Sequence, residues 1–256
     1  MSKTGKVYLI GAGPGDIELL TLKAVRAIGE SDVILMDSLA TDEVLRYAKP
    51  TARVEEVGKR GGRHSIKQSA IESRLLEAAK EGLTVARIKG GDPSIFGRGG
   101  EEIECLQRND IAYEVIAGVT AASGICATLG ISLTHRDSSH SLIYLAGPHF
   151  EPPAETLRLP PLQDFGGTIV IYMGLKSCEK AAQELISRGL PPGTPSVAVQ
   201  SGTLADQRCA FAPLCELPGR VKAEKLESPV LLIIGQVVAL SPEYRRSTQL
   251  ALGAIS

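Results

Sequence analysis

The sequence predicts an α/β protein with two domains. Short apolar runs that fit buried strands alternate with segments whose apolar residues recur at helical spacing. This alternation is typical of a largely parallel sheet covered by helices on both faces. Five strand candidates are complete near residue 117, a second series of strands and helices begins after it, and we find no sequence repeat between the halves. A chain of 256 residues is long enough for two domains, each with its own core.

The first predicted domain, residues 1–117, alternates strands with helices. Thr21 fits an N-cap and Gly29 a helix end, whereas Ser65 and Gln68 have the spacing of a capping box. The predicted strands are residues 7–10, 33–36, 53–57, 84–88 and 112–116. The predicted helices are residues 21–29, 42–47, 65–82 and 101–108.

The second predicted domain, residues 118–242, starts with a segment rich in small residues that suits a closely packed helix, residues 118–133. A proline-rich stretch and an extended piece interrupt the later elements, and residues 243–256 are predicted to be a tail. The predicted strands are residues 141–146, 168–173, 196–200 and 230–234, the helix is residues 178–188, and the two interruptions are residues 152–161 and 207–213.

Composition narrows the class of protein. A net charge of -1 gives no general attraction to nucleic acid or membranes, and no apolar run approaches the roughly 20 residues of a spanning helix. The first residues lack a signal-peptide core, so we expect a cytoplasmic protein. The five cysteines form no C-x-x-C pair and fit buried, reduced thiols, and the four histidines lack metal-ligand spacing, so we expect no metal site.

The segment from Gly90 to Glu102, GGDPSIFGRGGEE, is predicted to be the working centre. It holds five glycines and three carboxylates directly after the apolar run 85–88. A strand-to-helix turn needs one or two glycines, so the excess favours a backbone that lines a ligand. A mobile surface loop is the alternative.

A second glycine motif follows the first strand. Gly11-x-Gly-x-Gly, with Asp37 after the second strand, resembles a dinucleotide fingerprint and leaves a nicotinamide-dependent oxidoreductase as an alternative. However, Pro14 has no N–H to donate, and Asp16 places a negative charge where a phosphate would bind. A nucleoside without phosphate fits this loop better.

Local basic groups are candidates for binding a polyanion. The loop 59–64 contains four basic or potentially basic residues, although a solvated surface explains such a run equally well. Arg98 lies between two glycines and is open to bidentate contact with carboxylates, and Arg136 is a further candidate. Glu101 lies three residues from Arg98 and is a candidate base, whereas the helix dipole suffices to explain Glu102.

Several motifs together resemble the tetrapyrrole methylases, which are class III S-adenosylmethionine-dependent methyltransferases, and among them the enzymes that methylate uroporphyrinogen III. The resemblance extends over nearly the whole chain in order. The motifs are VYLIGAGPGD, VGKRGGRHS, GGDPSIFGRGGEE, AGVTAASG, SLTHRD, YMG and VLLIIGQVV.

The resemblance implies a fold and a reaction. The fold would be two α/β/α domains with mainly parallel mixed sheets and an active-site cleft between them, in a homodimer. The reaction would transfer methyl groups from S-adenosylmethionine to C2 and C7 of uroporphyrinogen III, giving precorrin-2 by way of precorrin-1 and leaving S-adenosylhomocysteine. The donor has no phosphate and the acceptor is a polycarboxylate, which agrees with the residue-level expectations.

The resemblance also implies site residues. In the donor site, Asp92 would pair with the ammonium group of the donor, and a methionine thioether suits the surroundings of the adenine or the sulfonium. The implied donor-binding residues are Pro14, Gly90, Gly91, Asp92, Thr120, Ala121, Met173, Gly202 and Val230. For the acceptor, Glu101 would take the pyrrole N–H proton. The implied acceptor-binding residues are Lys59, Arg63, Arg98 and Arg136, of which Arg98 and Arg136 would act with Glu101 in catalysis.

Three departures from the family pattern fall at Ser38, at Ser94 and in residues 146–149. These departures concern the affinity for the acceptor, or which of its rings is methylated, more than the binding of the donor. Related methylases that act on later precorrins or on diphthine share the donor site, and a tetrapyrrole carrier without activity is another alternative. The sequence leaves open whether the product serves sirohaem, cobalamin or haem d1.

Overall fold

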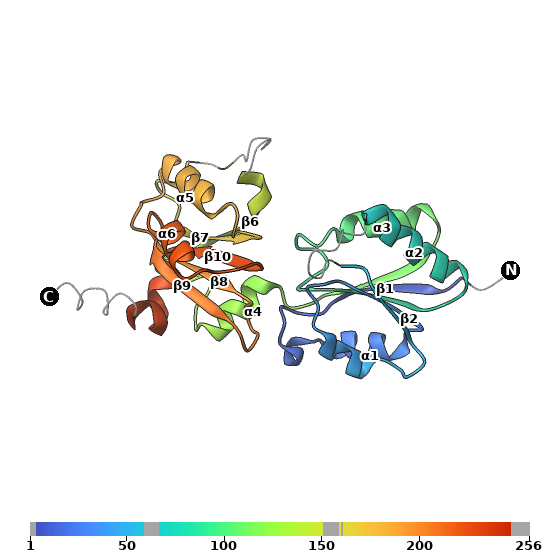
Figure 1. Cartoon of the computed structure of the whole chain (residues 1–256). Coiled ribbons are helices and arrows are strands. Elements are labelled where there is room, and N and C mark those ends of the chain that lie inside the picture. The colour runs from blue at the N-terminus through green and yellow to red at the C-terminus, as the bar shows by residue number, and fades with distance from the viewer. Residues whose placement is uncertain (1–3, 59–66, 151–158, 160, 247–256) are drawn as a thin grey trace. The chain divides into compact units, whose positions relative to one another are not determined.

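The computed structural model describes residues 4–58, 67–150, 159 and 161–246 (Figure 1). The chain divides into two compact units, Met1–Gly124 and Ile125–Ser256, and each contains one five-stranded sheet with helices. The predicted α/β fold class is confirmed. The boundaries expected near residues 117 and 242 stay a prediction.

The first unit is built on a fully parallel sheet with the strand order β3-β2-β4-β1-β5. Since the strands are parallel, their carboxyl ends meet at one edge, and the loops that follow β1, β4 and β5 gather there. The strands are β1 (Lys6–Gly11), β2 (Val33–Met36), β3 (Arg53–Glu56), β4 (Val85–Lys89) and β5 (Ala112–Ile116).

Helices cover both faces of this sheet, with α1 on one side and α2 and α3 on the other (Figure 1). Alternate strand residues point to opposite faces, so Ile34 packs with α1 while Leu35 packs with α2 and α3. The helices are α1 (Leu22–Glu30), α2 (Gln68–Lys80) and α3 (Gly99–Arg108), with short 3₁₀ helices η1 (Ile17–Leu19) and η2 (Asp42–Tyr47).

The helix ends test the predicted caps. Thr21 caps α1 as predicted, because its hydroxyl accepts from the Ala24 N–H at 3.1 Å. Gly29 does not end this helix, which continues through Glu30. The predicted capping box is wrong for Gln68, which is the first residue of α2 and whose side chain instead reaches Glu102. Ser65 lies outside the described residues.

The second unit has a mixed sheet with the strand order β6-β7-β10-β8-β9. Only β6 and β7 pair in parallel, so the expectation of mainly parallel sheets holds for the first unit and not for this one. The reason is the short helix-free connection from β8 to β9, which forces an antiparallel pair. The strands are β6 (Ser141–Ala146), β7 (Gly167–Tyr172), β8 (Pro195–Gln200), β9 (Arg208–Pro213) and β10 (Val230–Ile234).

The helical elements of this region include one that the sequence pattern did not predict, α6 (Leu217–Ala223). Its second and third residues are Pro218 and Gly219, which break a helical pattern, although proline is tolerated in a first turn. The other elements are α4 (Ala121–Thr128), α5 (Cys178–Ser187), η3 (Gly147–Phe150) and η4 (Gln236–Leu240).

The cysteines are unpaired thiols. Cys105, Cys126 and Cys178 are buried as predicted, whereas Cys215 is exposed, which corrects the expectation for that residue. Burial raises the pKa of the Cys126 thiol to about 12, so this thiol stays protonated and acts as a small hydrophobic side chain.

Candidate functional site

Three glycine-containing loops contact one another through their backbones at the carboxyl edge of the first sheet. The Gly13 N–H donates to the Gly91 carbonyl at 3.2 Å, and the Gly91 N–H donates to the Gly13 carbonyl at 2.6 Å. A Cβ on Gly118 would lie 2.2 Å from the Gly91 oxygen, so no larger residue fits there. Main-chain atoms of the loops after β1, β4 and β5 therefore meet directly at this edge.

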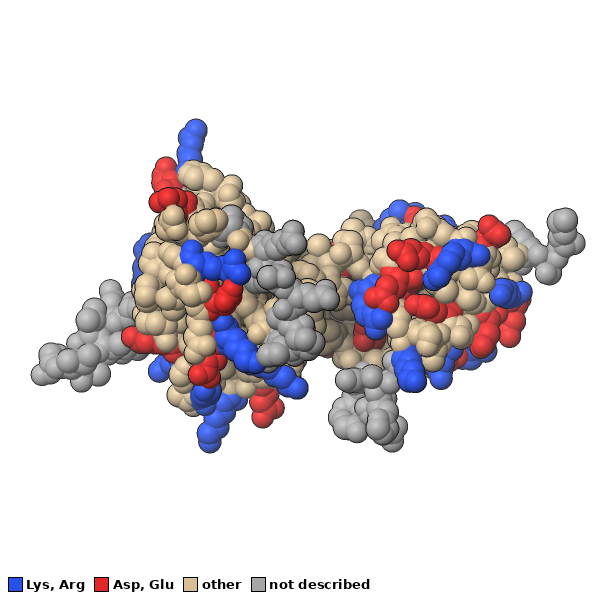
Figure 2. Space-filling model, turned by 90° about the horizontal axis from the view of Figure 1, so that it is seen from above, with Lys and Arg blue, Asp and Glu red and all other residues tan. Residues whose placement is uncertain are grey.

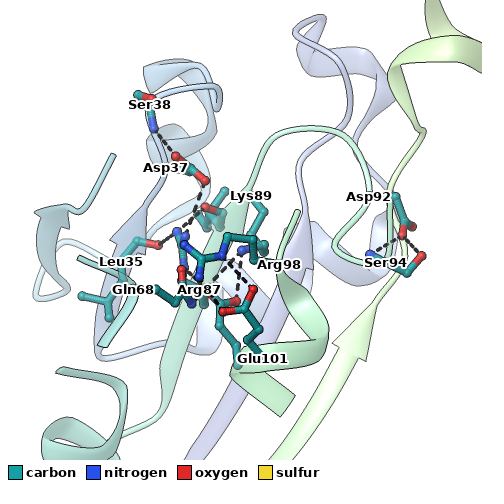
Figure 3. Close-up of polar contacts among 12 residues, drawn as sticks. Leu35, Asp37, Ser38, Gln68, Arg87, Lys89, Asp92, Ser94, Arg98 and Glu101 are labelled. Carbon is teal, nitrogen blue, oxygen red and sulfur yellow. Dashed lines mark hydrogen bonds and ion pairs between the residues drawn. The ribbon is translucent and has the colours of Figure 1, made fainter. Parts of the chain in front are cut away.

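Asp92 links two of these loops. One carboxylate oxygen accepts from the Gly118 N–H at 2.9 Å. The other accepts from the Ser94 N–H at 2.8 Å and from the Ser94 hydroxyl, and these two contacts are drawn in Figure 3. A carboxylate has about four lone-pair sites, so it retains capacity for a cationic ligand. The predicted contact with a donor ammonium is compatible with this geometry and stays a prediction.

The predicted donor-binding residues of the first unit lie together. The position of a Cβ on Gly91 is 3.8 Å from the Ala121 nitrogen and 4.0 Å from the Thr120 Cα. Pro14 follows the backbone bridge at Gly13. Gly90 is fixed by packing, because a Cβ there would lie 2.7 Å from the Leu39 Cβ. This set therefore brings together the loops after β1 and β4 and the start of α4.

Asp16 has a local structural role in the first loop. Its carboxylate accepts from the Glu18 N–H at 2.9 Å and so caps η1. A second anion at this position would meet the carboxylate, which agrees with the expectation that the loop does not bind phosphate.

Arg98 and Glu101 form an exposed ion pair at the start of α3 (Figure 3). The Arg98 guanidinium donates from Nε at 2.8 Å and from a terminal nitrogen at 2.5 Å to the two Glu101 oxygens. Arg98 is held at φ 55°, a left-handed conformation that is uncommon outside glycine. The hydrogen bonds from Arg98 lower the pKa of Glu101 and raise the pKa of Arg98, so both groups are charged.

A buried charge cluster, formed by Arg87, Lys89 and Glu102, lies beneath this pair. The Lys89 ammonium donates to both Glu102 oxygens at 3.1 and 3.0 Å, and Arg87 Nε donates to one of them at 3.0 Å. The exposed side-chain fractions are 2% for Arg87, 3% for Lys89 and 0% for Glu102. Burial lowers the pKa of Lys89, and the neighbouring Arg87 charge adds to this effect.

The sequence reasoning missed this cluster. It explained Glu102 by the helix dipole alone, whereas the side chain is the buried partner of two cations. The missed signal is the strand Val85–Lys89 itself, since Arg87 and Lys89 alternate along an otherwise apolar run and therefore share one face.

Two further polar groups surround the cluster. Gln68 of α2 donates to Glu102 at 3.3 Å, and a terminal nitrogen of Arg87 lies 3.5 Å from an Asp37 oxygen (Figure 3). Asp37 also accepts from the Ser38 N–H at 2.8 Å. The carboxylate that resembled a ribose-binding residue is therefore engaged by Arg87.

The predicted donor-binding residues of the second unit share one edge of its sheet. Met173 follows β7, Gly202 follows β8, and Val230 begins β10, which runs antiparallel to both strands. The Gly174 N–H donates to the Val230 carbonyl at 3.0 Å. Met173 is half-exposed with φ 56°, and a Cβ on Gly202 would lie 2.2 Å from an Ile125 side-chain carbon.

Arg136 is not brought together with these residues. It is exposed in the loop that precedes β6, and its neighbour His135 pairs with Ser139 through the backbone. Because β6 is parallel to β7, this loop lies at the opposite edge of the sheet from Met173. Lys59 and Arg63, the other predicted acceptor-binding residues, lie outside the described residues.

Within residues 4–58, 67–150, 159 and 161–246, no three His, Cys, Asp or Glu side chains are grouped so that they could hold a metal ion. None of the helices described there is both long and apolar enough to cross a membrane.

Comparisons with known proteins agree on a single family. Residues 6–218 match the family model described as Tetrapyrrole (Corrin/Porphyrin) Methylases. The chain is 48% identical to an S-adenosyl-L-methionine-dependent uroporphyrinogen III methyltransferase of Arabidopsis thaliana, which is described as chloroplastic. The alignment of 246 residues covers 96% of this chain and 67% of that protein. It is 43% identical over 238 residues to a methyltransferase of the same name from Methanosarcina barkeri, which covers 92% of this chain and 93% of that protein.

Other curated relatives are longer. The chain is 45% identical to siroheme synthase 2 of Halorhodospira halophila over 93% of its own length and 48% of that protein. It thus spans about half the length of the siroheme synthases that it matches.

Solved structures show the same similarity. A uroporphyrin-III C-methyltransferase from Thermus thermophilus is 40% identical, with a TM-score of 0.76 and coverage of 92% of this chain and 94% of that chain. A further structure of a Thermus thermophilus uroporphyrin-III C-methyltransferase, solved in complex with S-adenosylhomocysteine, is 37% identical, with a TM-score of 0.74 and the same coverage.

Proposed function

Since the chain belongs to the tetrapyrrole methylase family, we propose that it transfers methyl groups from S-adenosylmethionine to C2 and C7 of uroporphyrinogen III, giving precorrin-2 by way of precorrin-1. The observation that carries this proposal is the 43% identity to the Methanosarcina barkeri methyltransferase, which extends over 93% of that protein. The Thermus thermophilus structure with S-adenosylhomocysteine supports the choice of donor.

The first unit fits a donor that has an amino group and no phosphate. Glycine backbones meet at the carboxyl edge of the sheet, the Asp92 carboxylate is half-buried there, and Asp16 disfavours a further anion. The proposed donor-binding residues are Pro14, Gly90, Gly91, Asp92, Thr120 and Ala121, together with Met173, Gly202 and Val230 of the second unit.

Bound S-adenosylmethionine supplies an electrophilic methyl group. The residues of the chain then have to orient the acceptor carbon, exclude water and accept the proton that the pyrrole N–H loses. Orientation of two reactants in a dry site contributes about 7 to 11 kcal/mol to a rate enhancement. In this proposal the acceptor is held by Arg98, with Lys59 and Arg63 as further contacts, and Glu101 accepts the proton. Arg136 is left out of the proposal, because its loop lies at the opposite edge of the second sheet from Met173.

The ion pair between Arg98 and Glu101 suggests how the base is activated. In the free protein Arg98 lowers the pKa of Glu101, which makes this carboxylate a weak base. A carboxylate of the acceptor that takes over the Arg98 guanidinium removes this effect. The pKa of Glu101 then rises, and Glu101 becomes a stronger base when the acceptor is bound.

A homodimer in the cytoplasm, without a nucleic-acid or membrane partner, is part of the proposal. The net charge of -1 supports only the absence of a nucleic-acid or membrane partner, and cationic and anionic side chains are interspersed on the face of each unit seen in Figure 2. Light scattering during size-exclusion chromatography tests the dimer, because a monomer mass at micromolar concentration contradicts it.

The decisive test is a mass-spectrometric assay with uroporphyrinogen III and S-adenosylmethionine under anaerobic conditions. Two added methyl groups per acceptor are expected. The exposed pair of Lys222 and Glu179 in the second unit offers a matched control: Glu179→Gln should keep the activity and Glu101→Gln should lose it. Absence of methyl transfer by the folded wild-type protein, or tight NAD binding without S-adenosylhomocysteine binding, would overturn the proposal.

A further inference from the structure

The glycine-rich loop is closed at its base by the buried charge cluster. Lys89 is the last residue of β4 and directly precedes the loop, whereas Glu102 is the fourth residue of α3, which follows it. Their ion pair, with nitrogen–oxygen distances of 3.1 and 3.0 Å, therefore joins the two ends of the segment 90–101. This segment carries Asp92 near its start and the Arg98–Glu101 pair at its end.

The loop is packed against the closing ion pair. A Cβ on Gly97 would lie 3.3 Å from the Lys89 Cε, so the lysine stem lies directly under the loop. A Cβ on Gly99 would lie 2.4 Å from the Pro93 oxygen, which shows that the loop folds back on itself. A change in the position of Lys89 therefore acts on both halves of the loop.

Glu102 connects this base to two other elements, to α2 directly and to β2 through Arg87. Its carboxylate accepts from Lys89 and Arg87 of β4 and from Gln68 of α2. Arg87 in turn donates to the carbonyls of Leu35 in β2 at 3.4 Å and of Ile88 at 3.1 Å. Removal of one partner would leave an uncompensated charge in a nearly dry environment. The buried ion pairs therefore hold the first turn of α3 in one position against the sheet.

We propose that Lys89 and Glu102 are positioning residues, which clamp the base of the loop 90–101 and thereby place Asp92 and the Arg98–Glu101 pair for methyl transfer. Neither residue touches a ligand in this proposal. The kinetic part rests on the proposed function, whereas the clamp itself is a property of the fold that is measured without substrate.

The test compares Lys89→Met with two control variants. Lys89→Met removes the ammonium but leaves Glu102 paired with Arg87. Ile28→Ala weakens the core on the opposite face of the sheet and serves as the control for a general loss of thermal stability. Glu104→Gln removes an exposed carboxylate from the same helix α3.

Two readouts separate positioning from general stability. Hydrogen exchange of the segment 90–101 is expected to accelerate in Lys89→Met, with α1 unchanged, and to stay at the wild-type rate in Glu104→Gln. The kcat for methyl transfer is expected to fall by about 100-fold, because misplacement of reacting groups by about 1 Å has such a cost. Ile28→Ala should keep its kcat at a temperature where it is folded, and Lys89→Arg should recover part of the lost activity.

The outcomes are distinguishable. The clamp is wrong if exchange of the segment 90–101 is the same in Lys89→Met and in the wild type, or if Ile28→Ala and Lys89→Met change kcat equally. If the wild-type protein transfers no methyl group, the proposed function fails, and the exchange comparison still decides the clamp. Should Lys89→Met not fold, Lys89→Gln, which removes the charge but keeps a hydrogen-bond donor near Glu102, is expected to accelerate exchange in the same segment, and an unchanged rate would contradict the clamp.

Discussion

Glu101 and Glu102 are adjacent in the sequence and lie in opposite environments. Glu101 is half-exposed and pairs with one exposed arginine, whereas Glu102 is fully buried and pairs with Lys89 and Arg87. Successive helix positions differ by about 100° in direction, so one carboxylate of the first turn faces solvent and the next faces the sheet. Two residues of the same type therefore differ in burial alone: Glu102 is part of the fold, whereas Glu101 is accessible for the role as a base that we propose.

The two ion pairs also differ in energy. The exposed pair of Arg98 and Glu101 contributes little to stability, since water and salt screen it. Breaking a buried pair by removal of one partner costs about 3 to 5 kcal/mol, because the remaining charge stays uncompensated. The exposed pair is therefore free to exchange partners with a ligand, and the buried pair is not.

The largest effect on stability is expected for Glu102→Ala. The change leaves Arg87 and Lys89 buried without their shared carboxylate, so the free energy of unfolding should fall by about 3 to 5 kcal/mol. Urea titration followed by circular dichroism measures it. Equal stability of Glu102→Ala and the exposed control Glu104→Gln would contradict the assignment of Glu102 to the fold.

A large effect on activity, without one on stability, is expected for Glu101→Gln. Removal of a general base typically lowers kcat by about 100-fold or more, whereas loss of this exposed pair, which water and salt screen, should leave the free energy of unfolding close to that of the wild type. Steady-state kinetics and urea titration of the same preparation give both numbers. Wild-type kcat in this variant would remove Glu101 from the reaction.

The smallest effect concerns the titration of Glu101. The hydrogen bonds from Arg98 are the main cause of the lowered pKa of Glu101. Arg98→Ala should therefore raise the pKa of Glu101 toward the ordinary value for glutamate. Because the pKa in the folded protein is lowered, the pair stabilises the fold above the ordinary pKa of a glutamate, and this contribution is lost as the pH falls through the lowered value. NMR titration of the carboxyl carbon measures the shift, and an unchanged pKa in Arg98→Ala would show that Arg98 is not its cause.

Much of the fold follows from local sequence. The strands 33–36, 112–116, 141–146 and 230–234 have the predicted bounds, because apolar runs ended by turn or polar residues mark buried strands clearly. The direction of the second sheet was not predictable in this way, since strand pairing depends on connections and not on apolar runs. The helix α6 was not predicted because Pro218 and Gly219 interrupt the helical pattern of its apolar residues Leu217 and Val221, which are buried in the structure.

The site was predictable only in part. Glycine content marked the loop 90–102, and the resemblance assigned roles to Asp92 and Arg98. The backbone bridge between Gly13 and Gly91 joins residues that are 78 positions apart, and no local pattern records such a contact. The contact of Glu102 with Lys89 likewise depends on how α3 packs on the sheet, and the position of Glu102 in the first turn of a helix does not reveal that packing.

Binding of S-adenosylhomocysteine to Asp92→Ala and Arg98→Ala, measured by calorimetry beside the wild type, tests most directly whether the glycine-rich loop serves two ligands. Loss of one charge-assisted contact should weaken binding to Asp92→Ala by about tenfold to a hundredfold. Arg98→Ala should bind this ligand as the wild type does and should raise the KM for uroporphyrinogen III. Asp92→Asn, which keeps one acceptor oxygen for Gly118, separates charge from loop structure. If both alanine variants weakened only donor binding, the division of the loop between donor and acceptor would be contradicted.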